Sequence, residues 1–321
     1  RPVEIFRQLE RVRVRLPECS TACRDWPELA AELCTRDCVL VIVNTRKQAR
    51  ELWRLMPPGT LHLSALMCGA HRAAVIDEIR QRLADKRTGC DGRPLRVIST
   101  QLVEAGVDID FPAVYRAFAG LDSLAQAAGR CNREGHLAQG ELVVFHPPEP
   151  PPPGLLRRGA DACRSVLACP SVKLLSPLSP ELFEPYFDSY YYGIDLDAKG
   201  IVRDLTPDAR LEIRFRTAAD NFKLIDDEDQ ASVFVRWEGH PDIGMLLATL
   251  ERDGPERWLM RKLQRCAVNL PRRTLARLLS QGDIREVRPG CYLQNNDLLY
   301  DPILGLLDEE NFTPTPDRLI L

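Results

Sequence analysis

Two arginines three residues apart follow a glycine in the segment QAAGRCNREG, residues 126–135. The apolar run before them predicts a helix over 121–128, and side chains three and four positions apart share a helical face. We therefore expect Gln126, Arg130 and Arg133 on one face, beside Gly129, whose missing side chain permits a close approach. A guanidinium offers a planar fork of donors and a permanent charge, which suits a polyphosphate. The alternative is a solvated polar helix end, where arginines are also favourable.

A second polar cluster lies upstream, in STQLVEAGVDID at residues 99–110. It starts where an apolar strand over 95–99 is expected to end, and it contains a glycine turn at Gly106. In open α/β sheets, ligands bind outside the carboxyl ends of the strands, so we expect both clusters at that edge. In this order and spacing, the two segments resemble motifs five and six of the superfamily-two helicases.

Strand-like and helix-like segments alternate over the first 150 residues, which predicts an α/β fold with a parallel sheet and helices on both faces. The continuous apolar run VLVIV at 39–43 is typical of a strand buried on both faces, and alternation around 12–16 predicts a strand with one polar face. Further strands are expected at 61–66, 95–99, 114–118 and 142–145, and helices at 26–33, 46–55, 71–83 and 121–128.

The tract PPEPPPP at 147–153 interrupts every regular pattern and favours a stiff, extended spacer. We place a domain boundary there. Residues 1–150 then form the first domain, 151–204 a proline-rich linker with a connecting helical segment that includes 155–167, and 205–321 a smaller α+β domain. In the last domain we expect strands at 211–215, 232–235 and 291–293 and a helix at 275–279.

Polar residues follow three of the expected strands: Arg46 after the first, Ser64 after the second, and Thr100 with Gln101 after the third. Small hydroxyls and backbone N–H groups at helix N-termini are natural phosphate sites, although any α/β domain places polar residues at strand ends. Three such clusters at one edge predict contacts to phosphates.

Composition restricts the class of protein. The 321 residues are 45% hydrophobic and 28% charged, as in soluble globular proteins of one or two domains. A formal charge of −3 argues against a generally cationic nucleic-acid coat but allows a local basic groove. Arg257, Arg261 and Arg265 are spaced by fours, which puts them on one helical face; a solvated face is the default, and a nucleic-acid or protein contact is the alternative.

Several signals are absent from the sequence. No G-x-x-x-x-G-K-[ST] loop is present to hold phosphates, and we interpret the acidic run at 226–229 as a solvated turn. The five histidines include no close pair and no His-Asp dipeptide, so we expect no metal site and no nuclease within the chain. Cys19, Cys23, Cys34 and Cys38 lack the usual zinc-knuckle spacing. Eleven cysteines without a signal peptide or an apolar span indicate free thiols in a reducing cytoplasm and no membrane partner.

Beyond the two motifs, several segments resemble the CRISPR-associated helicase–nuclease of type I interference systems, most closely its compact subtype C form. In that family a histidine–aspartate metal nuclease precedes two RecA-like motor domains and a C-terminal accessory domain. The chain, which starts at Arg1 rather than Met, resembles the second motor domain and the accessory domain of a longer polypeptide. The segments are LHLSALMCGAHR (61–72), LVEAGVDIDFP (102–112), QAAGRCNREG (126–135), FRTAADNFKLIDD (215–227) and NLPRRTLARLLSQGDI (269–284).

The resemblance implies a role for each motif. Arg130 and Arg133 would act as arginine fingers on a nucleotide held by another domain, while Gln126, Gly106, Asp108 and Gly129 line the nucleotide cleft. Asp108 would meet the ribose; the alternative is a turn-capping carboxylate. Arg46, Ser64, Thr100 and Gln101 would contact the phosphates of single-stranded DNA.

The resemblance also implies partners and cofactors. ATP and Mg²⁺ would be bound mainly by the first motor domain, and a divalent metal by the nuclease domain of the same protein. An RNA-guided surveillance complex would recruit the enzyme, which translocates 3′ to 5′ on single-stranded DNA. We expect the present chain alone to be inactive. Two alternatives remain: another superfamily-two repair helicase, and a non-enzymatic module that docks a partner.

Overall fold

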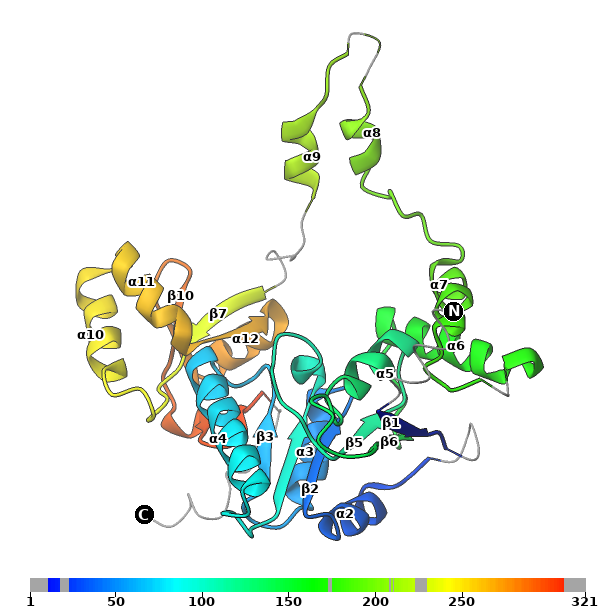
Figure 1. Cartoon of the computed structure of the whole chain (residues 1–321). Coiled ribbons are helices and arrows are strands. Elements are labelled where there is room, and N and C mark those ends of the chain that lie inside the picture. Colours follow the sequence, from blue (N-terminus) through cyan, green and yellow to red (C-terminus); the bar gives the residue numbers. More distant parts are fainter. Residues whose placement is uncertain are drawn as a thin grey trace.

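A six-stranded parallel sheet forms the centre of the first part of the chain (Figure 1). The computed structural model describes residues 11–17, 23–172, 175–207, 209, 211–222 and 230–308, so the acidic run at 226–229 and Cys19 lie outside the described residues. The strand order is β1-β6-β5-β2-β4-β3, and every neighbouring pair is parallel. The strands are β1 (Val12–Arg15), β2 (Cys38–Ile42), β3 (Leu61–Leu63), β4 (Leu95–Ser99), β5 (Ala113–Ala117) and β6 (Gly140–Phe145).

Helices cover both faces of this sheet. The helices α2 (Trp26–Cys34) and α3 (Arg46–Arg54) pack on one face, and α4 (Gly69–Arg87) and α5 (Leu121–Ala128) on the other. Strand β2 alternates between the two cores, because Leu40 and Ile42 face one and Val39 and Val41 the other. The expectation of a strand buried on both faces is confirmed.

Helix starts place polar residues at the carboxyl edge of the sheet. Thr45 follows β2 and accepts a hydrogen bond from the backbone N–H of Gln48 at 3.1 Å, which satisfies one of the free donors at the start of α3. Arg46 is the first residue of α3 and follows the end of β2 by four residues.

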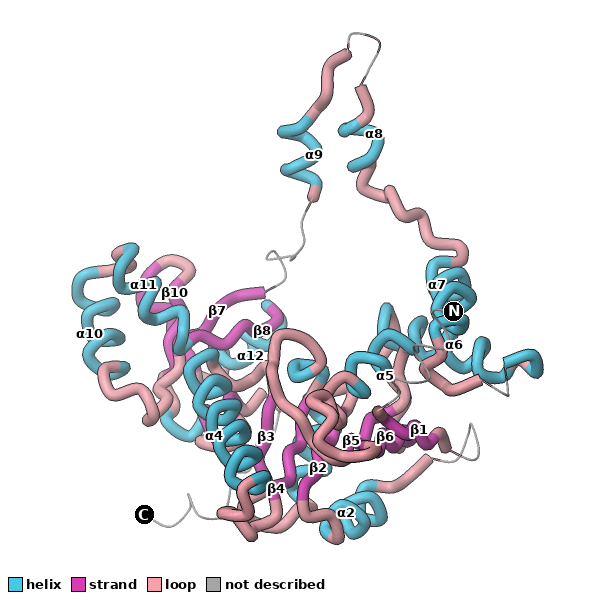
Figure 2. Tube along the Cα trace, in the orientation of Figure 1, coloured by secondary structure: helices cyan, strands magenta, loops and turns pink. Residues whose placement is uncertain are grey.

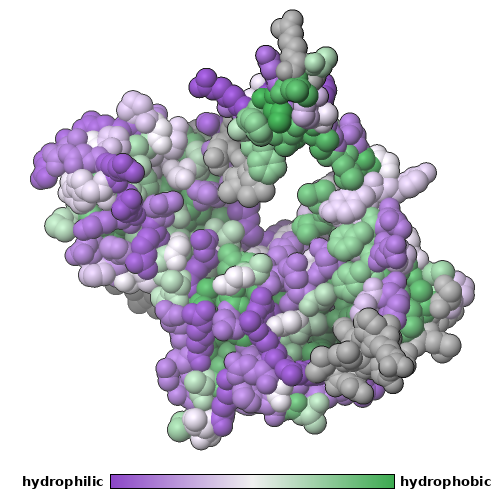
Figure 3. Space-filling model, turned by 45° about the horizontal axis from the view of Figure 1, so that its top comes forward, coloured by the Kyte–Doolittle hydropathy of each residue, from purple (hydrophilic) through white to green (hydrophobic). Residues whose placement is uncertain are grey.

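Two helices after the proline tract pack beside α5, and a two-helix arm follows them (Figures 1 and 2). Helices α6 (Leu155–Ala168) and α7 (Phe183–Tyr191) join the sheet core through Cys163 and Tyr186. The arm carries α8 (Ile201–Leu205) and α9 (Phe215–Asn221) and exposes apolar side chains, seen as green in Figure 3. The strand expected at 211–215 is wrong: Leu211 has a φ of 62°, outside the extended region, and α9 begins at Phe215.

The last part of the chain is a smaller α+β unit. Its mixed sheet has the order β8-β7-β10-β9, in which only the β10–β7 pair is parallel. The fold class expected from the sequence, a RecA-like parallel sheet followed by a smaller α+β unit, is confirmed. The elements are β7 (Gln230–Phe234), α10 (Ile243–Asp253), α11 (Arg257–Leu263), β8 (Ala267–Pro271), α12 (Arg272–Ser280), β9 (Ile284–Arg288), β10 (Cys291–Gln294), β11 (Tyr300–Asp301) and β12 (Gly305–Leu306).

The α+β unit docks on the loop that follows β3. Leu66 of that loop belongs to the core of the unit, and its carbonyl accepts a hydrogen bond from the backbone N–H of Leu306 at 2.8 Å. The hydroxyl of Tyr300 accepts from the backbone N–H of Cys68 at 2.9 Å, and the ring of His71 stacks on Trp237 with centroids 5.2 Å apart. The C-terminal unit therefore lies beside the carboxyl edge of the sheet. None of the described helices is both long and apolar enough to cross a bilayer.

Gly305 tests this docking. It has a φ of 80°, and a Cβ there would lie 2.5 Å from the carbonyl oxygen of Leu66, which is backbone and cannot move aside. Gly305→Ala should lower the free energy of unfolding for two reasons, the strain of a left-handed backbone and the overpacking of the added Cβ. We expect overpacking to add about 1–3 kcal/mol to the loss that strain alone causes. Gly290→Ala is the matched control, because Gly290 has a φ of 75° and open space around its Cβ position. Equal losses for the two variants in urea unfolding would contradict the tight contact.

Candidate nucleotide and nucleic-acid site

The two arginines of residues 126–135 lie near the amino end of β5. The backbone N–H of Phe111, just before β5, donates to the carbonyl of Arg130 at 2.9 Å. The backbone N–H of Asn132 donates to the carbonyl of Phe111, also at 2.9 Å. Helix α5 starts after the carboxyl end of β5 and must run back across the sheet before β6, the next parallel strand, can begin. The expectation that both polar clusters share the carboxyl edge is therefore wrong.

A turn, rather than a helix, presents Arg133. Helix α5 ends at Ala128, and Asn132 adopts a left-handed φ of 45°. The side-chain amide of Asn132 holds this turn by donating to the carbonyls of Arg11 at 3.1 Å and Leu137 at 2.9 Å. A shared helical face for Gln126, Arg130 and Arg133 is wrong, because the chain leaves the helix before Arg133.

Two carboxylates fix Arg133 from the segment before β5. Asp110 accepts the backbone N–H of Arg133 at 2.7 Å and that of Glu134 at 3.4 Å, so Asp110 is the carboxylate that caps the turn. Asp108 instead contacts the Arg133 guanidinium, with 2.5 Å between Nη1 and Oδ1. The two side chains of this pair are 46% and 71% exposed, and an ion pair so exposed contributes little to stability. The guanidinium is thus oriented but open to an arriving anion.

The Arg130 side chain is less exposed than that of Arg133 and is fixed by a backbone carbonyl. Its Nη2 donates to the carbonyl of Glu104 at 2.7 Å, and its Nε is buried without a hydrogen-bond partner among the described residues. Burial lowers the pKa of Arg130, and the nearby charge of Arg133 adds to the effect. Two like charges that are brought together and partly desolvated form a site that a polyanion would stabilise.

The other residues expected in the nucleotide cleft take less specific positions. Gln126 and Gly106 are exposed, and Gly106 has a φ of 71°, as a glycine turn requires. Gly129 has an ordinary φ of −66° and ends the helix. With Arg133 it lines a largely apolar cavity of about 510 Å³ beside β1.

A buried ion pair connects the segment before Arg130 to the sheet. The Arg116 side chain is fully buried in β5, and its Nε lies 2.8 Å from Oε1 of Glu104. Its Nη1 donates to Oδ1 of Asn44 at 2.7 Å, which ties in the end of β2. Burial raises the pKa of Glu104, and the charge of Arg116 opposes that rise. Sequence reasoning missed this network, although a lone arginine in an apolar strand was a usable signal.

The residues expected to contact phosphates do meet at the carboxyl edge of the sheet. The backbone N–H of Thr100 donates to the carbonyl of Leu63 at 3.2 Å, and Nε2 of Gln101 donates to the carbonyl of Asn44 at 3.0 Å. Ser64 and Thr100 are only 1% and 6% exposed, and the hydroxyl of Ser64 accepts from the N–H of Leu66 at 3.3 Å. Gln101 is the half-buried member of the cluster.

Arg46 already faces a carboxylate at this edge. Its Nη1 lies 3.6 Å from Oδ2 of Asp308, while Arg50 approaches the other oxygen at 2.7 Å. Arg277 of the C-terminal unit donates to the backbone carbonyl of Asp308 at 2.6 Å. The start of α3 therefore binds an anionic group, here one supplied by the chain itself. No local pattern indicates this contact, because Asp308 is 262 positions away from Arg46.

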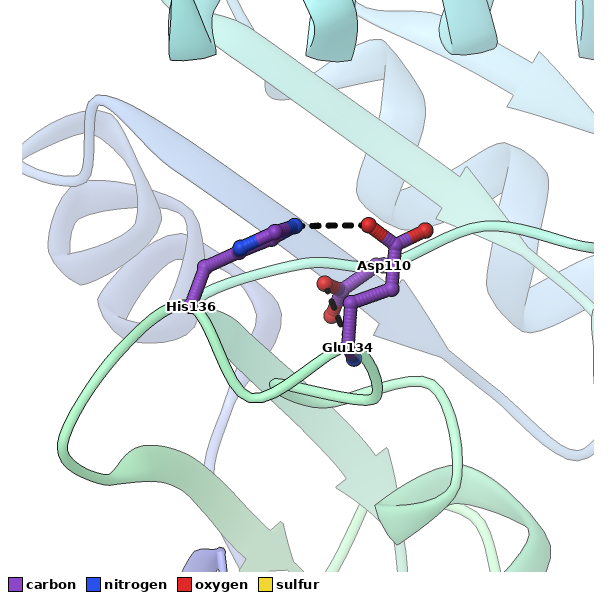
Figure 4. Close-up of side chains that lie close together, drawn as sticks. All are labelled: Asp110, Glu134 and His136. Carbon is purple, nitrogen blue, oxygen red and sulfur yellow. Dashed lines mark hydrogen bonds and ion pairs between the residues drawn. The ribbon is translucent and has the colours of Figure 1, made fainter.

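Asp110, Glu134 and His136 form a cluster with metal-ligand chemistry (Figure 4). Their ligand atoms lie within 4.8 Å of one another. Arg87 already forms ion pairs with both carboxylates, with its guanidinium 2.8 Å from Glu134 and 3.4 Å from Asp110. Because Asp110 also caps the Arg133 turn, the cluster acts as a support for that turn.

Comparison with known proteins identifies relatives of the sheet domain. Residues 35–136 match the family model described as CRISPR-associated nuclease/helicase Cas3, C-terminal. The chain is 35% identical over 113 residues to a CRISPR-associated nuclease/helicase Cas3 of Methanothermobacter thermautotrophicus and 46% identical over 65 residues to one of Haloferax volcanii. These stretches cover 33% and 20% of the chain but only 13% and 7% of the two relatives.

Solved structures share the fold. The crystal structure of T. fusca Cas3-ADP superposes with a TM-score of 0.62 at 17% identity, over 93% of this chain and 42% of that one. A CRISPR RNA-guided surveillance complex in a pre-nicking state contains a chain that matches with a TM-score of 0.56 at 18% identity, over 93% of this chain and 44% of that one. The chain thus spans less than half the length of the solved structures that it matches.

The Glu104–Arg116 pair can be tested with a double-mutant cycle. We expect Glu104→Leu to lower the free energy of unfolding by about 3–5 kcal/mol, because it leaves a buried guanidinium without its counter-charge. The double variant Glu104→Leu/Arg116→Met removes both charges, and its free energy of unfolding should fall much less than that of Glu104→Leu alone. Denaturant unfolding of the two single variants and the double variant measures the coupling. A double variant at least as unstable as the sum of the singles would contradict a coupled buried pair.

Proposed function

The chain belongs, through residues 35–136, to the family of C-terminal regions of CRISPR-associated Cas3 nuclease/helicases, and on this premise we propose that it completes the ATP site of a DNA translocase. In this proposal Arg130 and Arg133 are arginine fingers that face a nucleotide held by a first motor domain. The observation that carries it is the arrangement of the pair: Arg130 is fixed with its Nε unused, and Arg133 is exposed on a capped turn beside it.

The chemistry follows from charge. During phosphoryl transfer, charge spreads over the oxygens of the transferred group, and an arginine placed there can raise the rate roughly 10³–10⁵-fold. Arg130 and Arg133 would stabilise that charge. Asp108 would release Arg133 on nucleotide binding and approach the ribose, with Gln126, Gly106 and Gly129 lining the cleft. When bound, ATP with Mg²⁺ supplies the energy for translocation.

The buried network gives this site a mechanical link. Glu104 contacts Arg130 through its carbonyl and Arg116 through its carboxylate, and Arg116 reaches Asn44 beside Gln101. A shift of Arg130 toward a nucleotide would therefore be transmitted to the carboxyl edge through packed polar contacts. This route would connect ATP hydrolysis to DNA movement.

At the carboxyl edge we propose contacts to the backbone of single-stranded DNA. Arg46 and Gln101 are the accessible members, and Ser64 and Thr100 would contribute once the edge opens. Contacts to phosphates hold any sequence, which suits a motor in a system where RNA pairing selects the target. Movement 3′ to 5′, recruitment by a surveillance complex, and cutting by a metal nuclease domain of the same protein complete the proposal.

The finger assignment is tested by Arg133→Ala, in the chain combined with a first motor domain of a Cas3 relative in cis or in trans. We expect DNA-stimulated ATP hydrolysis to fall by at least 10³-fold, because the variant removes charge stabilisation of the transition state. Binding of single-stranded DNA should stay within about twofold, since Arg133 lies away from the carboxyl edge. Phosphate release and fluorescence anisotropy measure the two quantities.

Arg93→Ala is the control for this experiment. Arg93 is also an exposed arginine paired with an aspartate, with 3.1 Å between its Nε and Asp91, but it lies before β4. It should leave both quantities unchanged. Unaltered hydrolysis in Arg133→Ala would overturn the finger role, and DNA binding without any nucleotide dependence would favour the docking-module alternative.

A further inference from the structure

Helix α11 and the turn after it form an uncompensated basic stripe. Arg257, Arg261, Lys262 and Arg265 are all exposed, and residues 257–265 contain no acid. Within the described part of the chain, none of these four cations forms an ion pair with a carboxylate. Arg257, Arg261 and Arg265 follow one another about 6 Å apart along the helix axis.

The stripe gathers four exposed cations that have no acidic partner within nine consecutive residues. Three exposed arginines elsewhere on the surface, Arg15, Arg93 and Arg164, each have a guanidinium within 3.1 Å of a carboxylate. The whole chain has a formal charge of −3, so four unpaired cations on three turns are a local concentration of charge. A helix surface with charges of both signs would offset this concentration internally, and residues 257–265 carry no acid that could do so.

The stripe begins at the carboxyl edge of the sheet. Gly69, the first residue of α4, lies against the backbone of Arg265, whose carbonyl oxygen would be 3.4 Å from a Cβ at that position. Arg72 of α4 is on the same side, with its Nη2 4.0 Å from that point. The loop that starts at Ser64 leads into α4. A nucleic-acid strand that ran from the sheet edge toward the C-terminal unit would therefore reach Arg72 and Arg265 first.

An aromatic ring interrupts the stripe. Trp258 is 49% exposed, and the Lys262 ammonium lies 5.6 Å from the centroid of its ring. Its indole N–H donates to Glu256, which holds the ring in place. Cations that follow a phosphate backbone, combined with an exposed ring for a base, are the combination by which proteins bind single strands without reading sequence.

We propose that α11 binds the backbone of a single nucleic-acid strand that continues from the carboxyl edge of the sheet onto the C-terminal unit. Arg257, Arg261 and Arg265 contact successive phosphates, and Trp258 stacks on a base. This inference rests on the proposed function for the path of the strand. A protein partner fits less well, because the stripe has few apolar side chains and its charges are of one sign.

The test measures binding of a fluorescent oligothymidine to the purified 321-residue chain at several salt concentrations. The triple variant Arg257→Gln/Arg261→Gln/Arg265→Gln should bind about 100-fold more weakly at 0.1 M salt. The plot of log affinity against log salt concentration should become less steep by about 2, because three phosphate contacts are lost and each contributes about 0.7 to the slope. Trp258→Ala should weaken binding roughly tenfold without changing the slope.

Arg15→Gln/Arg93→Gln/Arg164→Gln removes the same charge from ion-paired sites and is the matched control, which should keep the wild-type slope. Arg46→Gln separates the stripe from the sheet edge. If Arg46→Gln weakens binding but the stripe variant does not, the stripe proposal fails and the proposed function stands, with a protein as the remaining partner for α11. Absence of any salt-dependent binding by the wild-type chain also overturns the stripe, whereas the ATP-site proposal is decided by the Arg133 experiment.

Discussion

The charge of Arg116 at the centre of a buried sheet is the constraint on which the site depends. A guanidinium with no exposed surface must have its charge compensated inside the protein, so Glu104, as counter-charge, and Asn44, as acceptor for Nη1, are held at fixed positions. Glu104 lies on the connection between β4 and β5, and Asn44 follows β2. One buried charge thus sets the position of the loop on which Arg130 rests and of the edge where Gln101 lies.

The sequence predicted the sheet well because its signals are local. Apolar runs such as 39–43 specify strands buried on both faces, and the alternation of strands and helices requires parallel pairing. Helix α5 was expected at 121–128 and is found there. The strand expected at 211–215 failed because a short alternating pattern carries no information about whether a neighbouring strand exists, and no strand among the described residues pairs with this segment.

The arrangement of the site was less predictable, for two reasons. The left-handed turn at Asn132 depends on bonds to Arg11 and Leu137, so the direction of Arg133 is decided by tertiary contacts that spacing alone does not reveal. The contact of Asp308 with Arg46 joins residues 262 positions apart. By contrast, Arg116 was detectable, because a charge inside an apolar strand must have a buried partner.

The two edges of the sheet then acquire different tasks. In the proposed translocase, the amino end of β5 would present the arginine pair to a ligand held elsewhere, and the carboxyl edge, with the docked C-terminal unit, would present Arg46 and the stripe on α11 to a nucleic-acid strand. The proposed motor would need such a separation, because the nucleotide and the nucleic-acid strand would bind at the same time without sharing cations. The segment from Gln101 to Asp110 crosses the sheet between the edges and is anchored midway by Glu104, so a displacement at one end has a defined path to the other.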